Sequence, residues 1–144
     1  MMRSGIVMGE GGGALRRQLP LFRFGVGGPL STGKQWLSPI SLVDEVKAIL
    51  WIVDRKVSAP VNLTRPSPIT NSQFTRESAR ALRRLAVMKV PALALKVALG
   101  SQMTRDGVLA SQRVVPLVLS REGLVFNNPD VHAIISEVVR PRIN

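Results

Sequence analysis

The alternation of apolar and polar residues predicts helices that are separated by short strands. The clearest helix covers Val43 to Arg55, where apolar residues recur at helical spacing along one stripe: Val43, Val46, Leu50 and Val53, widened by Ile49. Ser41 is suited to cap its start, and Asp44 and Glu45 suit the positive end of the helix dipole. This segment is therefore predicted to be a helix with one apolar face.

Two further helices carry start signals. Thr70-Asn-Ser-Gln73 is a capping box, and it predicts a helix to about Arg84 whose core-facing residues are Phe74, Ala81, Leu82 and Leu85. Asn128 followed by Pro129 predicts a cap and a first-turn proline for a last helix that reaches about Val139.

The other segments are shorter. Strands or extended segments are expected at Arg3–Met8, Gln35–Ile40, Pro60–Thr64, Met88–Val90 and Leu124–Phe126. Helices are expected at Ala14–Phe24, Pro91–Gly100 and Asp106–Arg113, and a helical turn between Pro116 and Gly123. The fold class is therefore α/β and helix-rich. Because the first strand begins almost at Met1, we expect the chain to open in the middle of a fold.

Composition is typical of a single globular domain. The chain has 144 residues, 45% of them hydrophobic and 20% charged, and it has no cysteine. Disulfides and thiolate chemistry are therefore excluded. No apolar run approaches the length of a membrane span, and arginine and glycine residues interrupt any signal-like apolar stretch at the N-terminus. A cytoplasmic protein without a membrane partner is expected.

The formal net charge of +11 raises the question whether the chain binds nucleic acid. The basic residues are scattered along the chain, no aromatic residues are interleaved with them, and tyrosine is absent. A base-stacking platform is therefore not expected, and a solvated basic surface explains the charge.

Two glycine-rich stretches come close to nucleotide-binding motifs. Gly9–Ala14 fits G-x-G-x-x-A, but no acidic residue that could hold a ribose occurs between Glu10 and Asp44. Gly28–Gln35 comes close to G-x-x-x-x-G-K-S/T, but Gln35 stands where the magnesium-binding hydroxyl belongs. Pro39 also prevents a long helix from starting at Lys34. Neither stretch is interpreted as a nucleotide site, and no cofactor is expected in this chain.

Four stretches, taken together, resemble the C-terminal portion of the epimerase-family proteins, which are atypical extended short-chain dehydrogenase/reductases described as nucleoside-diphosphate-sugar epimerases. The stretches are Arg3–Leu15, Gly25–Ser38 with its Gln-Trp-x-Ser, Pro60–Asn62 with Pro68–Thr75, and Val90–Asp130 with Ser-Gln-Arg-Val. The resemblance covers Arg3 to Val139. It implies the remainder of an epimerase/dehydratase-like domain at residues 1–86, the family's C-terminal domain of unknown function at 87–139, and a tail at 140–144.

The same resemblance also implies which parts of the family's fold and chemistry this chain lacks. The fold class becomes the helix-rich, substrate-side part of an extended short-chain dehydrogenase/reductase, with its Rossmann sheet mostly absent. Full-length relatives imply NADP and a Tyr-x-x-x-Lys pair, but this chain has no tyrosine. Inside the matched region, Pro39 and Ser41 replace an aromatic residue and a histidine, and Ser101-Gln102 replaces a glutamate. Tyrosine-dependent chemistry is therefore not expected within this chain.

Candidate substrate contacts are Gln35, Trp36, Asn62 and Arg113, because an amide, an aromatic face and a guanidinium suit a phosphorylated sugar. Trp36 is equally suited to the core, Asn62 to a turn and Arg113 to a surface ion pair. His132 is the single histidine and gives no metal site.

Three hypotheses follow. The chain is a substrate-side fragment of a nucleotide-sugar epimerase or reductase, inactive alone; or an interaction module that pairs with a separate cofactor-binding domain or an acidic partner; or, least favoured, a nucleic-acid-binding protein. In the first case the apolar face around Val46, Leu50 and Val53 is expected to be partly exposed and to favour self-association.

Overall fold

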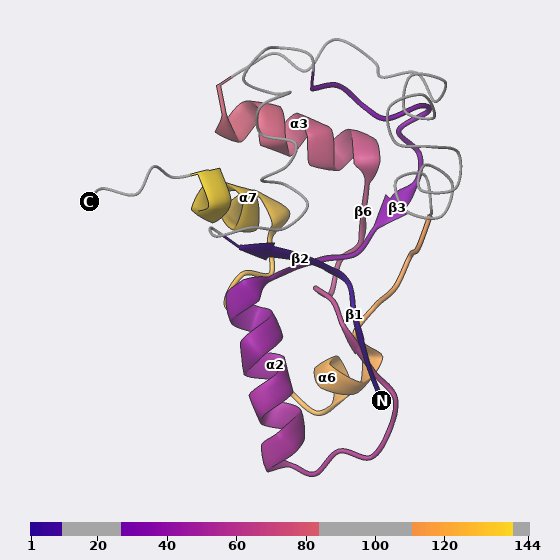
Figure 1. The fold of residues 1–144 in the computed structure, drawn as a ribbon, viewed down its shortest axis with the longest axis vertical. Helices are drawn as coiled ribbons and strands as arrows, with labels where there is room; N and C mark the ends of the chain where they lie inside the picture. The colour runs from indigo at the N-terminus through magenta and orange to yellow at the C-terminus, as the bar shows by residue number, and fades with distance from the viewer. Residues whose placement is uncertain (10–26, 84–110, 140–144) are drawn as a thin grey trace, which may run out of the picture.

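The computed structural model describes residues 1–9, 27–83 and 111–139. Its strands are β1 (Met2–Ser4), β2 (Ile6–Gly9), β3 (Trp36–Leu37), β4 (Pro39–Ser41), β5 (Val61–Leu63) and β6 (Ile69–Thr70). Its helices are α2 (Leu42–Asp54), α3 (Asn71–Ala81), α6 (Leu117–Arg121) and α7 (Val131–Val139). The strands form three two-stranded sheets (Figure 1). The described part of the chain is therefore α/β, with small sheets and more residues in helices than in strands, as predicted.

The first nine residues form one extended segment that changes partner at Gly5. β1 pairs in parallel with β5, and β2 pairs in parallel with β4. At the switch, the Gly5 amide donates to the Leu63 carbonyl at 2.9 Å, and the Ile6 amide donates to the Ser38 carbonyl at 3.0 Å. This segment therefore ties the two parallel sheets together.

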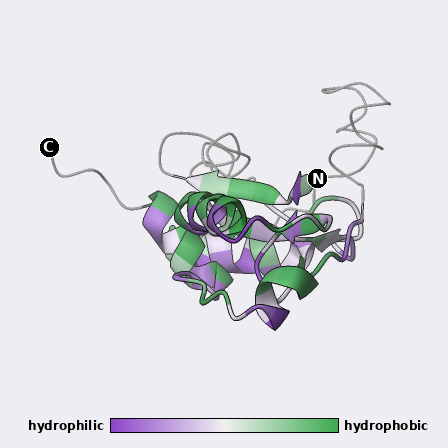
Figure 2. Ribbon diagram, turned by 90° about the horizontal axis from the view of Figure 1, so that it is seen from below, coloured by the Kyte–Doolittle hydropathy of each residue, from purple (hydrophilic) through white to green (hydrophobic). Residues whose placement is uncertain are grey.

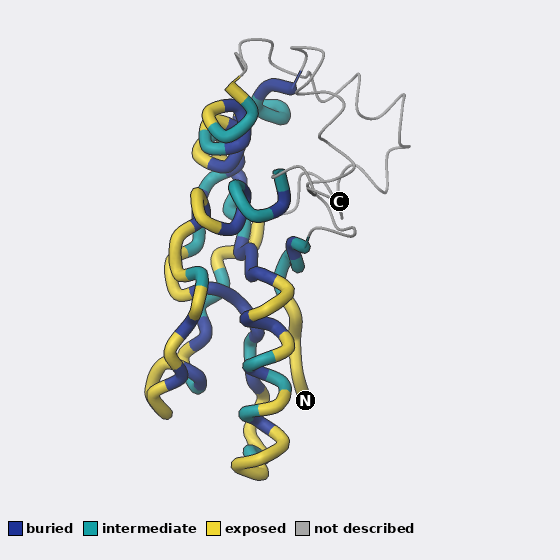
Figure 3. Tube along the Cα trace, turned by 90° about the vertical axis from the view of Figure 1, so that its left-hand side faces the viewer, coloured by how far each residue is buried: buried dark blue, intermediate teal, exposed yellow. Residues whose placement is uncertain are grey.

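Helix α2 begins where the sequence predicts. The Ser41 side chain accepts a hydrogen bond from the Asp44 amide at 3.1 Å, which satisfies one of the unpaired donors of the first turn. The buried face of α2 consists of Asp44, Glu45, Ala48 and Ile52. Most of the apolar stripe lies on the other side, where Val46, Leu50 and Val53 are exposed (Figure 3). The expected exposure of that face is confirmed.

Helices α3 and α7 pack against each other beside β2 (Figure 1). The capping box of α3 is formed as predicted: the Gln73 amide donates to the Thr70 hydroxyl at 3.3 Å, and the Thr70 amide donates to Gln73 Oε1 at 2.8 Å. Buried side chains from both helices, β2 and β6 form the first apolar cluster: Met8, Ile69, Phe74, Val131, Ile134, Ile135 and Val138.

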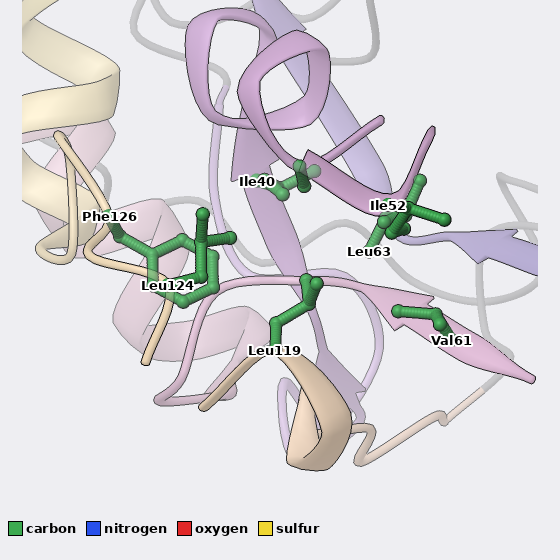
Figure 4. Close-up of a cluster of buried hydrophobic side chains, with 8 residues drawn as sticks. Ile40, Ile52, Val61, Leu63, Leu119, Leu124 and Phe126 are labelled. Carbon is green, nitrogen blue, oxygen red and sulfur yellow. The ribbon is translucent and has the colours of Figure 1, made fainter. Parts of the chain in front are cut away.

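A second cluster lies between α2, β5 and α6 (Figure 4). Its buried members are Ile40, Ala48, Ile52, Val61, Leu63, Leu119, Leu124 and Phe126. Leu119 is a fully buried residue of the short α6, and Gly123 follows that helix with a φ of 83°, which glycine adopts without strain. This cluster packs β5, the strand that carries Asn62, against α2 and α6.

Three local predictions are wrong. Leu124–Phe126 is not a strand, although the burial of Leu124 and Phe126 and the exposure of Val125 do alternate. Ser111–Arg113 is not helical, because this segment extends along β3. Asn128 does not cap α7: its side-chain amide donates to Glu137 Oε2 at 3.1 Å, and Asp130 Oδ1 accepts from the His132 amide at 3.2 Å.

Other predictions lie outside the described residues. These are the helices at Ala14–Phe24 and Pro91–Gly100, the extended segment Met88–Val90, Leu85, the departure at Ser101-Gln102 and the domain boundary after residue 86.

Candidate substrate-side site

A cavity of about 530 Å³ opens where the first strand segment, β3, β5 and the segment before α6 meet. It is lined by Arg3, Ser4, Gly5, Ile6, Trp36, Leu37, Ser38, Asn62, Thr64, Gln112 and Val114. Its volume lies in the range typical of small-molecule sites, and its lining combines one aromatic ring with several hydroxyl and amide groups. Such a lining suits a polar ligand that has hydroxyl groups.

Ser38 holds the two sides of this cavity together. Its hydroxyl lies 2.9 Å from the Gln112 carbonyl and 3.1 Å from the Val114 carbonyl, and it accepts the Val114 amide at 3.0 Å. The Gln112 amide donates to the Trp36 carbonyl at 3.1 Å. Because Ser38 is buried, these bonds are shielded from water and fix the segment from Ser111 against β3.

Trp36 and Arg113 are brought together, although 77 positions separate them. The Arg113 guanidinium carbon lies 4.7 Å from the centroid of the Trp36 ring, a cation–π distance. The Trp36 side chain is only half-buried and lines the cavity. The Arg113 side chain is exposed. Arg113 does not line the cavity, but its guanidinium covers one face of the Trp36 ring and so places a positive charge next to a lining residue.

Asn62 lies on β5 and also lines the cavity. Its side-chain amide donates to the Val115 carbonyl at 3.3 Å, which leaves its carbonyl oxygen as an acceptor. The neighbouring Thr64 hydroxyl is buried and has no hydrogen-bond partner among the described residues. A buried polar group without a partner is costly, so this hydroxyl is a candidate for a ligand or water contact.

Gln35 has a different role from the other predicted residues. It is buried, and its side-chain amide donates to the Leu30 carbonyl at 3.0 Å, while its backbone carbonyl accepts the Asn71 amide at 2.9 Å. It does not line the cavity. Gln35 therefore fixes the loop that delivers Trp36. The chain after Lys34 enters β3 and no helix, so the arrangement differs from a P-loop.

A buried carboxyl group lies one hydrogen bond away from the cavity. The Ser4 hydroxyl donates to Glu45 Oε1 at 2.5 Å, and Glu45 Oε2 is buried without a partner among the described residues. Burial raises the pKa of Glu45, and the hydrogen bond from Ser4 lowers it by a smaller amount. The protonated form of Glu45 is thus favoured relative to an exposed glutamate.

Most of the lining residues were not predicted from the sequence. Arg3 and Ser4 lie on β1, Thr64 follows β5 and Gln112 precedes α6, and no local pattern indicates that these three segments meet. The Gln-Trp-x-Ser and Ser-Gln-Arg-Val motifs are the sequence features that point to this cavity. The structure places the two motifs in direct contact. Among the described residues, no group of His, Cys, Asp or Glu is arranged to hold a metal, and no helix is long and apolar enough to span a bilayer.

Comparisons with known proteins agree with this architecture. The sequence profile of a family described as "Domain of unknown function (DUF1731)" matches residues 90–138. An epimerase family protein of Mycobacterium bovis is 41% identical over 129 residues, which are 89% of this chain and 42% of that protein. The chain thus spans less than half the length of that relative.

Two solved structures share the fold. The human epimerase family protein SDR39U1, crystallised with NADPH, superposes with a TM-score of 0.88 at 30% identity. The superposition covers 95% of this chain and 46% of the human chain. The nucleoside-diphosphate sugar epimerase from Corynebacterium glutamicum superposes with a TM-score of 0.67 at 28% identity. The superposition covers 95% of this chain and 25% of the bacterial chain. In sequence and in fold, this chain corresponds to the C-terminal portion of an epimerase family protein.

Proposed function

We propose that this chain forms the substrate side of an NADP-dependent nucleoside-diphosphate-sugar epimerase or reductase, and that it is inactive alone. In this proposal the cavity beside β3 receives the sugar nucleotide in the cytoplasm. The ring of Trp36 stacks on an apolar face of the ligand, the carbonyl of Asn62 accepts a hydroxyl, and Arg113 faces a phosphate.

The observation that carries the proposal is the pairing of Trp36, which lines the cavity, with Arg113, which lies against the Trp36 ring but does not itself line the cavity. An aromatic face and a guanidinium 4.7 Å apart suit a sugar linked to a phosphate, because the ring packs on carbon and the guanidinium bonds to oxygen. Gln35 acts as a positioning residue in this scheme, since its buried amide holds the loop before Trp36. NADP is assigned to a cofactor-binding part outside this chain, and the crystallisation of the human relative with NADPH supports the choice of cofactor.

Tryptophan fluorescence tests the proposal directly, because the chain has two tryptophans. Trp51→Phe leaves Trp36 as the single indole, and titration with UDP-glucose is expected to change its emission saturably. Arg113→Gln is expected to weaken binding about tenfold, as for the loss of one charge-assisted contact. Arg121→Gln, an exposed arginine on α6, is the matched control and should leave the affinity unchanged.

Three results would contradict the proposal. They are an unchanged emission of Trp36, an equal effect of the two arginine variants, and turnover of a nucleotide sugar by this chain without a second protein. Saturable binding of NADPH to the chain alone would equally overturn the assignment of the cofactor to another part.

A second candidate is an interaction module that pairs with a separate cofactor-binding domain. The exposed apolar residues of α2 favour it, since Val46, Leu50 and Val53 are 48%, 64% and 66% exposed on one helix. Co-purification with such a domain, lost on Leu50→Lys and retained on Val125→Lys, is the expected outcome.

A further inference from the structure

A second cavity of about 530 Å³ lies between α3 and the start of α7. Its charged side chains are Arg65, Arg76, Arg80, Glu77 and Asp130, and His132 stands at the same edge. It shares no lining residue with the cavity beside β3. Nothing in the proposed function uses this groove.

Arg65 is the unusual residue of the groove. It is 5% exposed, and its Nε and Nη1 atoms are buried without a hydrogen-bond partner among the described residues. Burial lowers the pKa of Arg65, and the charge of Asp130 raises it by a smaller amount. Burial of a cation without a hydrogen-bonded partner is costly, and a guanidinium stays charged under ordinary conditions. The buried charge of Arg65 is therefore not balanced by a hydrogen-bonded partner at these two atoms among the described residues.

The neighbouring carboxylates do not form an ion pair with Arg65. Glu77 Oε1 lies 3.5 Å from Arg80 Nη1, and Glu77 Oε2 lies 3.2 Å from His132 Nδ1. These are the ion pairs of the described residues, so no described carboxylate reaches Arg65 within the same distance limit of 4.0 Å. Asp130 Oδ1 accepts the His132 amide instead. Both acids are thus bonded at the start of α7 and on α3, and neither forms an ion pair with the Arg65 guanidinium.

We propose that this groove binds the terminal phosphate of a small phosphate monoester. Arg65 contacts the phosphate from the buried side, and Arg76 and Arg80 contact it from α3. The forked guanidinium matches two phosphate oxygens at once, and the three arginines outnumber the two carboxylates of the groove. A terminal phosphate projects from its molecule and reaches a buried arginine, whereas a phosphodiester within a duplex is held on both sides.

NMR titration of the whole chain tests this site. Inorganic phosphate and ribose 5-phosphate are the probes, and sodium chloride at equal ionic strength is the reference. We expect saturable shifts of the Arg65 Nε–H signal and of the backbone amides of Gln73–Arg80 and Val131–His132. Arg65→Gln should abolish these shifts. Arg76→Gln, on the exposed side of α3, should weaken binding about tenfold and does not threaten the fold.

Arg121→Gln is the matched control, because Arg121 is exposed and lies on α6 outside the groove. Equal shifts with sodium chloride would overturn the proposal, as would an equal loss of affinity in Arg76→Gln and Arg121→Gln. Duplex DNA that binds more tightly than ribose 5-phosphate, with equal dependence on both arginines, would show scattered surface charge in place of a site. The tryptophan assay above is independent, because Trp36 lies in the other cavity.

Discussion

Gly5 occupies a position where even a methyl group does not fit. A Cβ atom there would lie 2.1 Å from the Ser38 carbonyl oxygen and 2.9 Å from Thr64 Cγ2. Since the nearer neighbour is backbone, the strand segment itself would have to move. Gly5→Ala is therefore expected to lower the free energy of unfolding by about 1–3 kcal/mol in urea denaturation. Gly9→Ala is the control: its Cβ meets the exposed Leu42 side chain at 3.1 Å, so about 0.5 kcal/mol is expected. Equal losses would contradict this explanation.

Glu45 makes stability depend on pH. Burial raises the pKa of Glu45 in the folded chain above its ordinary value, so the folded state holds the proton more tightly than the unfolded state. The resulting stability is fully present below the ordinary pKa and is lost as pH rises through the folded pKa. The glutamine side chain of Glu45→Gln cannot ionise, so this variant does not lose stability in this way as pH rises. The Tm of the wild type minus that of Glu45→Gln should therefore fall as pH rises above the ordinary pKa of glutamate and through the raised pKa of Glu45. A constant difference would show that the carboxyl group is not desolvated.

At the scale of the element, the start of α3 offers a test of its capping box. Thr70→Ala removes the acceptor for the Gln73 amide and is expected to cost about 1 kcal/mol of stability, measured by chemical denaturation. Thr70→Ser keeps a hydroxyl at the same place and should restore most of the loss. If both variants are equally destabilised, the packing of the threonine methyl group and not the hydrogen bond stabilises this helix start.

The helices that follow local rules were predicted well. Ser41 and Thr70 mark the starts of α2 and α3 because a cap is a contact between residues three positions apart. The start of α7 was misplaced, since Asn128 was expected to cap it. Instead, its backbone amide donates to Asp44 Oδ2 at 2.9 Å and its side chain bonds to Glu137. Asp44 lies 84 positions earlier in the chain, and local sequence carries no information on such a contact.

The candidate site shows the same limit. Trp36 and Asn62 were predicted from residue chemistry and do line one cavity, but the cavity exists because Ser38 bonds to a segment 74 positions later. Pairing at that separation depends on the whole fold and on no local pattern. The groove around Arg65 was not predicted, because a buried arginine cannot be told from a surface arginine until its neighbours are placed.

At the scale of the whole molecule, the unpaired face of α2 should control association. Leu42, Val43, Val46, Leu50 and Val53 are all exposed, and all five belong to α2. Figure 2 colours the chain by hydropathy, and Figure 3 colours it by burial. A contiguous apolar face of this kind favours burial against another surface. We expect sedimentation velocity to show concentration-dependent self-association of the isolated chain, together with binding of a hydrophobic dye.

Leu50→Lys places a charge at the centre of that face and should shift the chain toward monomer without loss of stability, since the Leu50 side chain is 64% exposed. Val125→Lys is the matched control, because Val125 is 74% exposed but lies outside α2, and it should leave the association unchanged. A wild-type chain that is a single monomeric species at every concentration, melts sharply and binds no dye would show that the face needs no partner. Equal effects of the two lysine variants would point to net charge as the cause, because each adds one positive charge to a chain of net charge +11.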